Sequence, residues 1–146
     1  MLSRLLISLL SKASRFGLSG YICNWLWYSK KAGTEATNRT NTLAPTQGLV
    51  LNLAKSLPQP QNYTLFTDNL FTNCPLALEL LQLNIGIMGT ARTKALGFPS
   101  RLVRLKENKK ALAWGTTRAE ITEQGKLLCF LWQDNNAVLG INPLSL

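Results

Sequence analysis

Hydrophobic and polar positions in the middle of the chain follow two periods, one helical and one extended. After Thr46, the predicted N-cap, apolar residues recur at helical spacing until Pro58 ends the pattern; they are Leu49, Val50, Leu53, Ala54 and Leu57. Residues 63–67, "YTLFT", are apolar, aromatic and β-branched, and predict a short buried strand that stops at Asp68. The pattern therefore predicts a helix followed by a strand.

A second helix and a second strand follow in the same order. Asn73 as N-cap and Pro75 in the first turn predict a helix whose apolar face comes from "PLALELLQL". The "NIG" at 84–86 ends this helix, and "IGIMGTAR" (85–92) predicts the next strand. Helices and strands alternating in this way indicate an α/β sheet with helices packed on its faces.

The segments on either side of this centre are rich in strand-forming residues. Residues 16–28, "FGLSGYICNWLWY", predict one strand or two short ones, and the polar residues 29–45 predict a loop. Further on, "ALAWGTTRAEIT" and "KLLCFLWQ" predict antiparallel strands, and "DNN" predicts a turn before "AVLGI". We therefore expect an α/β part over residues 15–111 and a β segment over residues 112–146.

The first 14 residues are basic and contain no acid, and we expect them to lie outside the fold. Arg4, Lys12 and Arg15, together with several serines, are typical of a mitochondrial leader. A basic amphipathic helix and a frayed end are the alternatives. The apolar run from Leu5 to Leu10 is too short to span a bilayer, so no membrane span is expected.

Composition narrows the chemistry that is open to the chain. Its 146 residues carry 16 Lys and Arg against seven Asp and Glu, and the net charge of +9 favours polyanion partners such as nucleic acid. Histidine does not occur, which excludes His-based acid–base catalysis and imidazole zinc sites. The three cysteines have no CxxC spacing, so neither a disulfide framework nor a cysteine-only zinc site is expected.

Two features carry candidate chemistry. Asp68 follows a predicted core strand, where open α/β sheets place ligand groups, so its carboxylate is a candidate Mg²⁺ ligand. The alternative is a structural Asx-type turn with Asn69. A basic run is a candidate phosphate-binding surface with Trp114 as a stacking platform, and its alternative is a solvated loop. The run consists of Arg92, Lys94, Arg101, Arg104, Lys106, Lys109 and Lys110.

Several of these segments together resemble the piggyBac-type transposases of the DDE superfamily. The resemblance is carried by "YTLFTDNLFTNCPLALELLQLNIGIMGTART" (63–93), because the family has a similar Asp-Asn-aromatic-Phe turn, then a helix, then a strand with the pattern "GIGxxGTxR". Weaker matches in consistent order extend it over residues 15–146; they are "GYICNWLWYS", "PTQGLVLNLAKSLP", "LAWGTTRA" and "FLWQDNNAVLG".

The resemblance implies an RNase H-like core in which three aspartates bind two divalent ions, Mg²⁺ in this family, and cut and rejoin DNA. Two ions about 4 Å apart stabilise the attacking and leaving oxygens of an in-line phosphoryl displacement. Asp68 corresponds to the second of these aspartates, as a catalytic and metal-binding residue. The family role is cut-and-paste DNA transposition, which implies a nuclear location, with a mitochondrial location as the alternative.

The chain departs from the family where the other two aspartates are expected. The resemblance places the first at Leu18, and a slip of one residue offers only Gly17 or Ser19. The third would lie beyond the last predicted strands, and Asp134 falls in a structural Trp-x-Asp turn. The family's N-terminal DNA-binding and dimerisation segments and its C-terminal cysteine-rich zinc region also have no counterpart in the 146 residues.

We therefore expect a truncated, incomplete RNase H-like core followed by an antiparallel β segment. The leading hypothesis is a piggyBac transposable element-derived fragment, a pseudoenzyme in which Asp68 is vestigial and no cofactor is expected. Its basic run would bind DNA weakly. The alternative is a domesticated non-catalytic protein that binds nucleic acid or an intact related transposase. Neither hypothesis includes a small-molecule substrate.

Overall fold

The computed structural model describes seven parts of the chain, with side chains from residue 43 onward: residues 3–10, 13–18, 21–27, 43–58, 63–108, 112–122 and 124–144. Most of the loop predicted over residues 29–45 lies outside these parts, as do Lys109 and Lys110. The described residues form three helices and eight strands.

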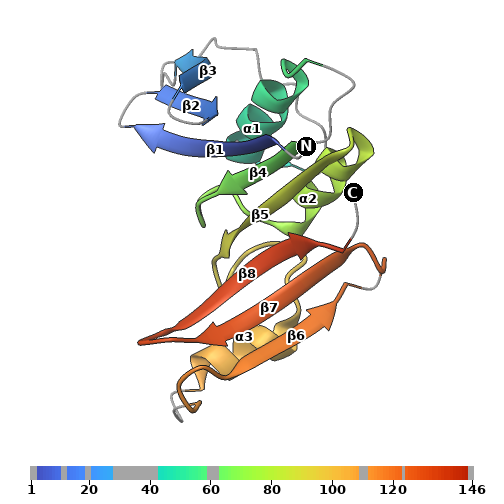
Figure 1. The fold of residues 1–146 in the computed structure, drawn as a ribbon. Helices are drawn as coiled ribbons and strands as arrows, with labels where there is room; N and C mark the ends of the chain where they lie inside the picture. Colours follow the sequence, from blue (N-terminus) through green and yellow to red (C-terminus); the bar gives the residue numbers. More distant parts are fainter. Residues whose placement is uncertain are drawn as a thin grey trace.

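The eight described strands form one mixed sheet in the order β3-β2-β1-β4-β5-β8-β7-β6 (Figure 1). Five of them make up the first part of the chain: β1 (Ser3–Leu10), β2 (Ala13–Leu18), β3 (Tyr21–Trp27), β4 (Tyr63–Thr67) and β5 (Ile85–Ala91). β1, β2 and β3 pair antiparallel, whereas β4 runs parallel to both β1 and β5. This is the mixed α/β sheet that the sequence predicts.

The first strand lies inside the sheet. In β1, Leu6 pairs with Gly17 of β2 on one side and with Phe66 of β4 on the other. This differs from the expectation that the first 14 residues lie outside the fold. The physical reason is visible in "SRLLISLL", because a nearly continuous apolar run suits a strand that has neighbours on both sides.

Helix α1 (Pro45–Lys55) begins two positions earlier than predicted. Ala44 occupies the N-cap position without a side-chain cap, and Thr46 lies inside the first turn instead of capping it. Pro45 suits the first helical position because it has no N–H that needs a partner there. The apolar face is close to the predicted one, with Val50 and Leu53 fully buried.

Helix α2 (Cys74–Gln82) forms as the sequence predicts. The Oδ1 atom of Asn73 accepts a hydrogen bond from the backbone N–H of Leu76 at 2.9 Å, and Pro75 lies in the first turn. The helix ends before Asn84, which has a positive φ of 56° and turns the chain directly into β5. Asparagine is one of the few residues with a side chain that tolerate this conformation.

The last part of the chain adds the predicted antiparallel segment and one further helix. β6 (Thr117–Ile121), β7 (Leu127–Gln133) and β8 (Ala137–Pro143) pair antiparallel, and β8 joins the sheet beside β5. Helix α3 (Ser100–Glu107) falls within the basic run, where no helix is expected from the sequence. Its only buried residue is Leu102, so the apolar signal is short and is masked by the surrounding charges.

All three helices lie on the same face of the sheet (Figure 1). The buried side chains of neighbouring strands are in register on this face: Leu65 pairs with Ile87, and Cys129 pairs with Ile141. The opposite face is more open, and Trp132 on β7 is 43% exposed there. The core therefore lies between the sheet and the helices, and the ends of the strands remain accessible.

Candidate metal and nucleic-acid site

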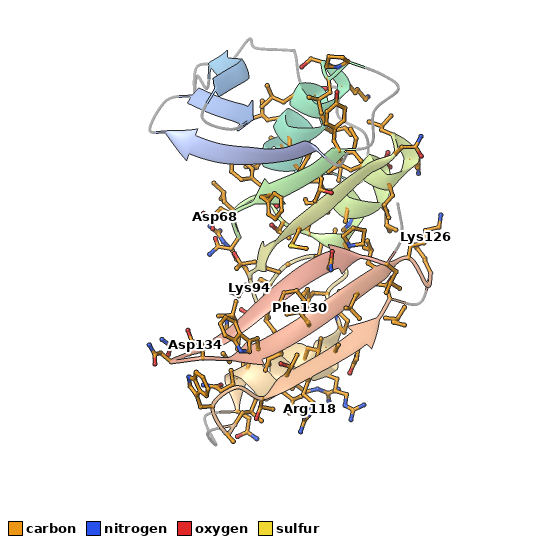
Figure 2. All side chains as sticks on the ribbon, viewed as in Figure 1. Asp68, Lys94, Arg118, Lys126, Phe130 and Asp134 are labelled. Atoms are coloured by element: carbon orange, nitrogen blue, oxygen red, sulfur yellow. The ribbon has the colours of Figure 1, made fainter. Side chains whose placement is uncertain are left out.

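Asp68 is the first residue after β4, at the carboxyl end of the strand. Tyr63, Leu65 and Thr67 of β4 are buried, whereas Asp68 is exposed to solvent. Figure 2 shows Asp68 on the side of the molecule that also carries Lys94 and Asp134 in this view. The sequence prediction that an acid ends this strand is therefore confirmed.

The backbone at Asp68 is fixed by a hydrogen-bonded turn. The Asp68 carbonyl oxygen accepts from the N–H of Phe71 at 3.0 Å and from the N–H of Thr72 at 3.2 Å. The hydroxyl groups of Thr67 and Thr72 are bonded to each other at 2.7 Å. Gly89 on β5 packs against both threonines so closely that a Cβ atom there would overlap them. These contacts hold Asp68 in place without using its carboxylate.

The carboxylate itself makes one local bond. Its Oδ1 atom accepts from the backbone N–H of Asn69 at 2.6 Å. This is a bond to the next residue, not the Asx-type turn, which needs the N–H two residues on. Asn73, and not Asp68, caps α2. Among the described residues, the bond from the N–H of Asn69 is the carboxylate's hydrogen bond, and because Asp68 is exposed, solvent reaches the carboxylate.

The neighbouring strands offer Asp68 no second carboxylate. Thr67 pairs with Ile7 of β1 and with Gly89 of β5, so the next positions on these strands are Ser8 and Thr90. Residues 1–34 contain no Asp or Glu at all. The strand β5, "IGIMGTA", contains none either.

A guanidinium group lies beside this turn instead. Arg92, the first residue after β5, donates from Nε to the Oδ1 atom of Asn69 at 3.2 Å. The side-chain amide of Asn69, the residue that follows Asp68, is thus already hydrogen-bonded to a positively charged group. The ends of β4 and β5 therefore carry one carboxylate, from Asp68, and one guanidinium group, from Arg92.

The structure divides the predicted basic run between two elements. Arg92 and Lys94 follow β5 and are exposed, whereas Arg101 and Arg104 lie on the exposed side of α3. Lys106 is half-buried on the same helix. Arg101 pairs with Glu120 at 3.6 Å, an exposed and therefore weak ion pair.

Trp114, the proposed stacking residue, is hydrogen-bonded to Asp134, the second aspartate of the chain. Trp114 is 76% exposed, and its indole Nε1 donates to the Oδ1 atom of Asp134 at 3.3 Å. Asp134 lies in the turn between β7 and β8, as the sequence predicts. One face of the indole ring is thus available to a ligand while its N–H is held by the turn.

Two buried cysteines form a pair that is not predicted from the sequence. Cys74 at the start of α2 and Cys129 in the middle of β7 are 55 residues apart in the chain, yet their Sγ atoms lie 3.8 Å apart. Only the alternating pattern of "LLCFLWQ", which places Cys129 on the buried face of its strand, hints at this arrangement.

Comparison with known proteins identifies the family. Residues 17–141 match the family described as Transposase IS4. The chain belongs to this transposase family. Its fold is similar to that of the piggyBac transposase in a cryo-EM structure of the synaptic complex with hairpin DNA, with a TM-score of 0.75 and 21% sequence identity. Among the curated proteins compared, none matches significantly.

These comparisons confirm the resemblance to piggyBac-type transposases and the α/β fold class. The match to the solved structure covers 96% of this chain and 33% of the piggyBac chain, so this transposase-family chain spans about a third of that relative. The family is one of metal-dependent DDE enzymes. Within the described residues, no helix combines the length and the apolar character needed to cross a membrane.

The strand register gives the position of Leu18, where the resemblance places the first aspartate, relative to Asp68. Leu18 ends β2, whose residue Gly17 pairs with Leu6 of β1, two strands away from β4. The position beside Asp68 on the adjacent parallel strand is Ser8 instead. Neither Leu18 nor Ser8 carries a carboxylate.

The residues present do not fit the two-ion centre of the transposase family. Such a centre needs several carboxylates, because each divalent ion must be held against water while it contacts the phosphate oxygens. The register places Ser8 on β1 and Thr90 on β5 in the positions next to Asp68, and neither residue is an acid. Among the described residues, no group of three or more Asp, Glu or Cys side chains is placed to hold a metal ion.

Proposed function

We propose that this chain is a piggyBac transposable element-derived protein that does not cut DNA by itself. The observation that supports this proposal is the isolation of Asp68 at the end of β4, with Ser8 and Thr90 in the adjacent positions. β1 and β5 occupy both sides of β4, so both strand positions beside Asp68 are filled by residues without a carboxylate.

The chemistry of the family makes one carboxylate insufficient. Two divalent ions in close contact repel each other, and their charge is balanced only when several carboxylates bridge or bind them. Asp68 alone can bind one hydrated ion weakly, as any exposed carboxylate can. It cannot hold a second ion in the geometry that an in-line phosphoryl transfer requires.

A nicking assay tests this proposal. Purified protein is incubated with supercoiled plasmid and Mg²⁺ or Mn²⁺, and the conversion of supercoiled to open-circular DNA is measured. We expect the wild-type chain and the Asp68→Ala variant to give the same background. Asp134→Asn is the matched control, because it changes the other aspartate of the chain, which lies in the turn between β7 and β8.

One outcome would contradict the proposal directly. It is metal-dependent nicking by the wild-type chain that is lost in Asp68→Ala and kept in Asp134→Asn. Nicking that persists equally in all three proteins indicates a contaminating nuclease, and repeated purification then removes it.

A second candidate function is nucleic-acid binding without chemistry. It is favoured by the exposed cations at two places, after β5 and on α3, and by the exposed ring of Trp114. Cations neutralise phosphates and aromatic rings stack on bases, so the two features are complementary. The solved piggyBac structure is a complex with DNA, which supports the same proposal by analogy. Binding to an intact related transposase is the alternative for this surface.

The transposase family also supports a nuclear location. The mitochondrial alternative rests on the first 15 residues, and residues 3–10 of this segment form β1 inside the sheet. Cleavage of a leader there would remove a strand that pairs on both sides. A full-length fluorescent fusion that coincides with mitochondria would contradict the nuclear proposal.

A further inference from the structure

The two buried cysteines lie where the two parts of the sheet meet. Cys74 opens α2, which packs on β5, and Cys129 belongs to β7 in the antiparallel segment. β5 and β8 pair over three residues only, fewer than any other two neighbouring strands of the sheet. The contact between the cysteines therefore crosses the narrowest junction of the fold.

The geometry brings both sulfurs within reach of a disulfide bond. The two Sγ atoms lie 3.8 Å apart, and neither cysteine is in a disulfide. A disulfide bond is about 2.05 Å long, so each sulfur has to move by about 1 Å, which rotation about χ1 allows. The backbone of Cys74 is held by the bond from its N–H to the carbonyl oxygen of Leu96 at 3.2 Å.

Cys74 is placed to react first. It lies at the N-terminal end of α2, where the helix dipole stabilises a thiolate, and its hydrogen bond with Cys129 lowers the pKa of the Cys74 thiol. The hydrogen bond to Cys74 raises the pKa of the Cys129 thiol, and burial adds to this, so Cys129 keeps its proton. Cys74 also lines a pocket of about 640 Å³ between α2, the start of α3 and β6, whereas Cys129 is fully buried.

We propose that Cys74 and Cys129 are an oxidation site that forms an internal disulfide with peroxide as the oxidant. The Cys74 thiolate attacks one oxygen of hydrogen peroxide, breaks the O–O bond and becomes a sulfenic acid, and the hydroxide released takes up a proton. The Cys129 sulfur then attacks the Cys74 sulfur, loses its proton and displaces the hydroxyl group as water. In sum, two thiols and one peroxide give one disulfide and two waters.

The expected consequence is a link between the two parts of the sheet. The disulfide closes a loop of 55 residues between α2 and β7 and so restricts the unfolded chain. It also ties the antiparallel segment to the first five strands beside their short pairing between β5 and β8. The oxidised chain should unfold at a higher temperature, by about 5–15 °C.

Mass spectrometry of the full chain tests the proposal. The folded protein is treated briefly with hydrogen peroxide, the remaining thiols are alkylated, and the unreduced protein is digested and mapped. Before alkylation we expect a mass lower by two hydrogen atoms, and after alkylation and digestion a peptide cross-link between Cys74 and Cys129 with alkylation of Cys23 alone. Dithiothreitol should restore three thiols.

Single variants make the test specific. Cys23→Ser should keep the cross-link, because β3 lies six strand spacings, roughly 29 Å, from β7. Cys129→Ser, which keeps a hydrogen-bond donor beside Cys74, should lose it and accumulate a sulfenic acid at Cys74 that dimedone traps. Cross-links that involve Cys23, or a wild-type protein whose Cys74 and Cys129 stay reduced while Cys23 is oxidised, would overturn the proposal. This wild-type map decides the question even if a variant fails to fold.

Discussion

At the scale of single residues, backbone hydrogen bonds and side-chain packing, and not the charge of Asp68, hold the turn at the end of β4. The backbone of Asp68 accepts two hydrogen bonds in its turn, and the hydroxyl of Thr72 adds a third at 2.9 Å. Thr67 and Thr72 fill the space beside Gly89. The turn therefore keeps its form whether or not Asp68 binds a metal ion, which explains how it can persist beside strands that carry no second acid.

Replacing Gly89 tests this packing. A Cβ atom at position 89 would lie 2.7 Å from the hydroxyl of each threonine and would also overlap the backbone oxygen of Thr67. Since backbone atoms cannot rotate away, we expect Gly89→Ala to lower the free energy of unfolding by at least about 2 kcal/mol. Urea unfolding followed by far-UV circular dichroism measures the change.

Gly48 is the matched control for this variant. It is the fourth residue of α1, and a Cβ atom there meets no atom within 4 Å apart from its chain neighbours and the adjacent backbone of its own helix. Alanine at this position should leave the free energy of unfolding unchanged or raise it by about 0.5–1 kcal/mol, because alanine lowers the conformational entropy of the unfolded chain. Equal losses in both variants would show that the packing around Gly89 is not the cause.

At the scale of elements, the identity of a strand depends on its neighbours. β1 has eight residues and pairs with β2 and β4, whereas β6 has five residues and pairs with β7 alone at the edge of the sheet. The burial of β6 agrees with its place at the edge, since four of its five residues are exposed. A strand with two partners contributes hydrogen bonds on both sides, and its loss opens the sheet.

Proline substitutions should separate these two roles. Leu6→Pro places a residue without an N–H in β1 opposite both Gly17 and Phe66, and we expect a loss of about 2–4 kcal/mol from the broken ladder. Ala119→Pro in β6 should cost clearly less, because edge strands tolerate proline. The midpoints of urea unfolding compare the two, and a milder effect of Leu6→Pro would contradict the central position of β1.

At the scale of the whole molecule, the excess of positive charge determines what the surface attracts. The chain has a net charge of +9, and the described cations of the basic run are spread over the end of β5 and the exposed side of α3. Lys126 lies at the other end of β7 and β8 from Lys94 (Figure 2). Cations at separate places bind phosphates as independent contacts, each of which releases counterions.

Binding to duplex DNA should therefore be strong at low salt and weak at moderate salt. For about four to six phosphate contacts, we expect affinity to fall roughly 10²- to 10³-fold between about 50 and 200 mM salt. Arg104→Gln and Lys94→Gln should each reduce the slope of log K against log salt by about 1, and Lys126→Gln should leave it unchanged. Fluorescence anisotropy with a labelled duplex measures this, and a flat salt titration would rule out electrostatic binding.

The sequence by itself determined the order of the central elements, because local signals are strong there. Asn73 and Pro75 mark the start of α2, Asn84 marks its end, and the acid after "YTLFT" marks the end of β4. The same local signals carried the resemblance to the transposase family. They were weaker in α3, where charges surround a single buried leucine, and in β1, whose basic and apolar residues also fit a leader.

Only the tertiary structure decided which residues face one another across the sheet. The register puts Ser8 and Thr90 beside Asp68, and it brings Cys74 to Cys129 over a separation of 55 residues. Pairing between distant strands depends on the sum of many weak contacts over the whole sheet, and no local pattern encodes it. For this reason the sequence located Asp68 correctly, whereas its neighbours, which decide what Asp68 can do, came from the fold.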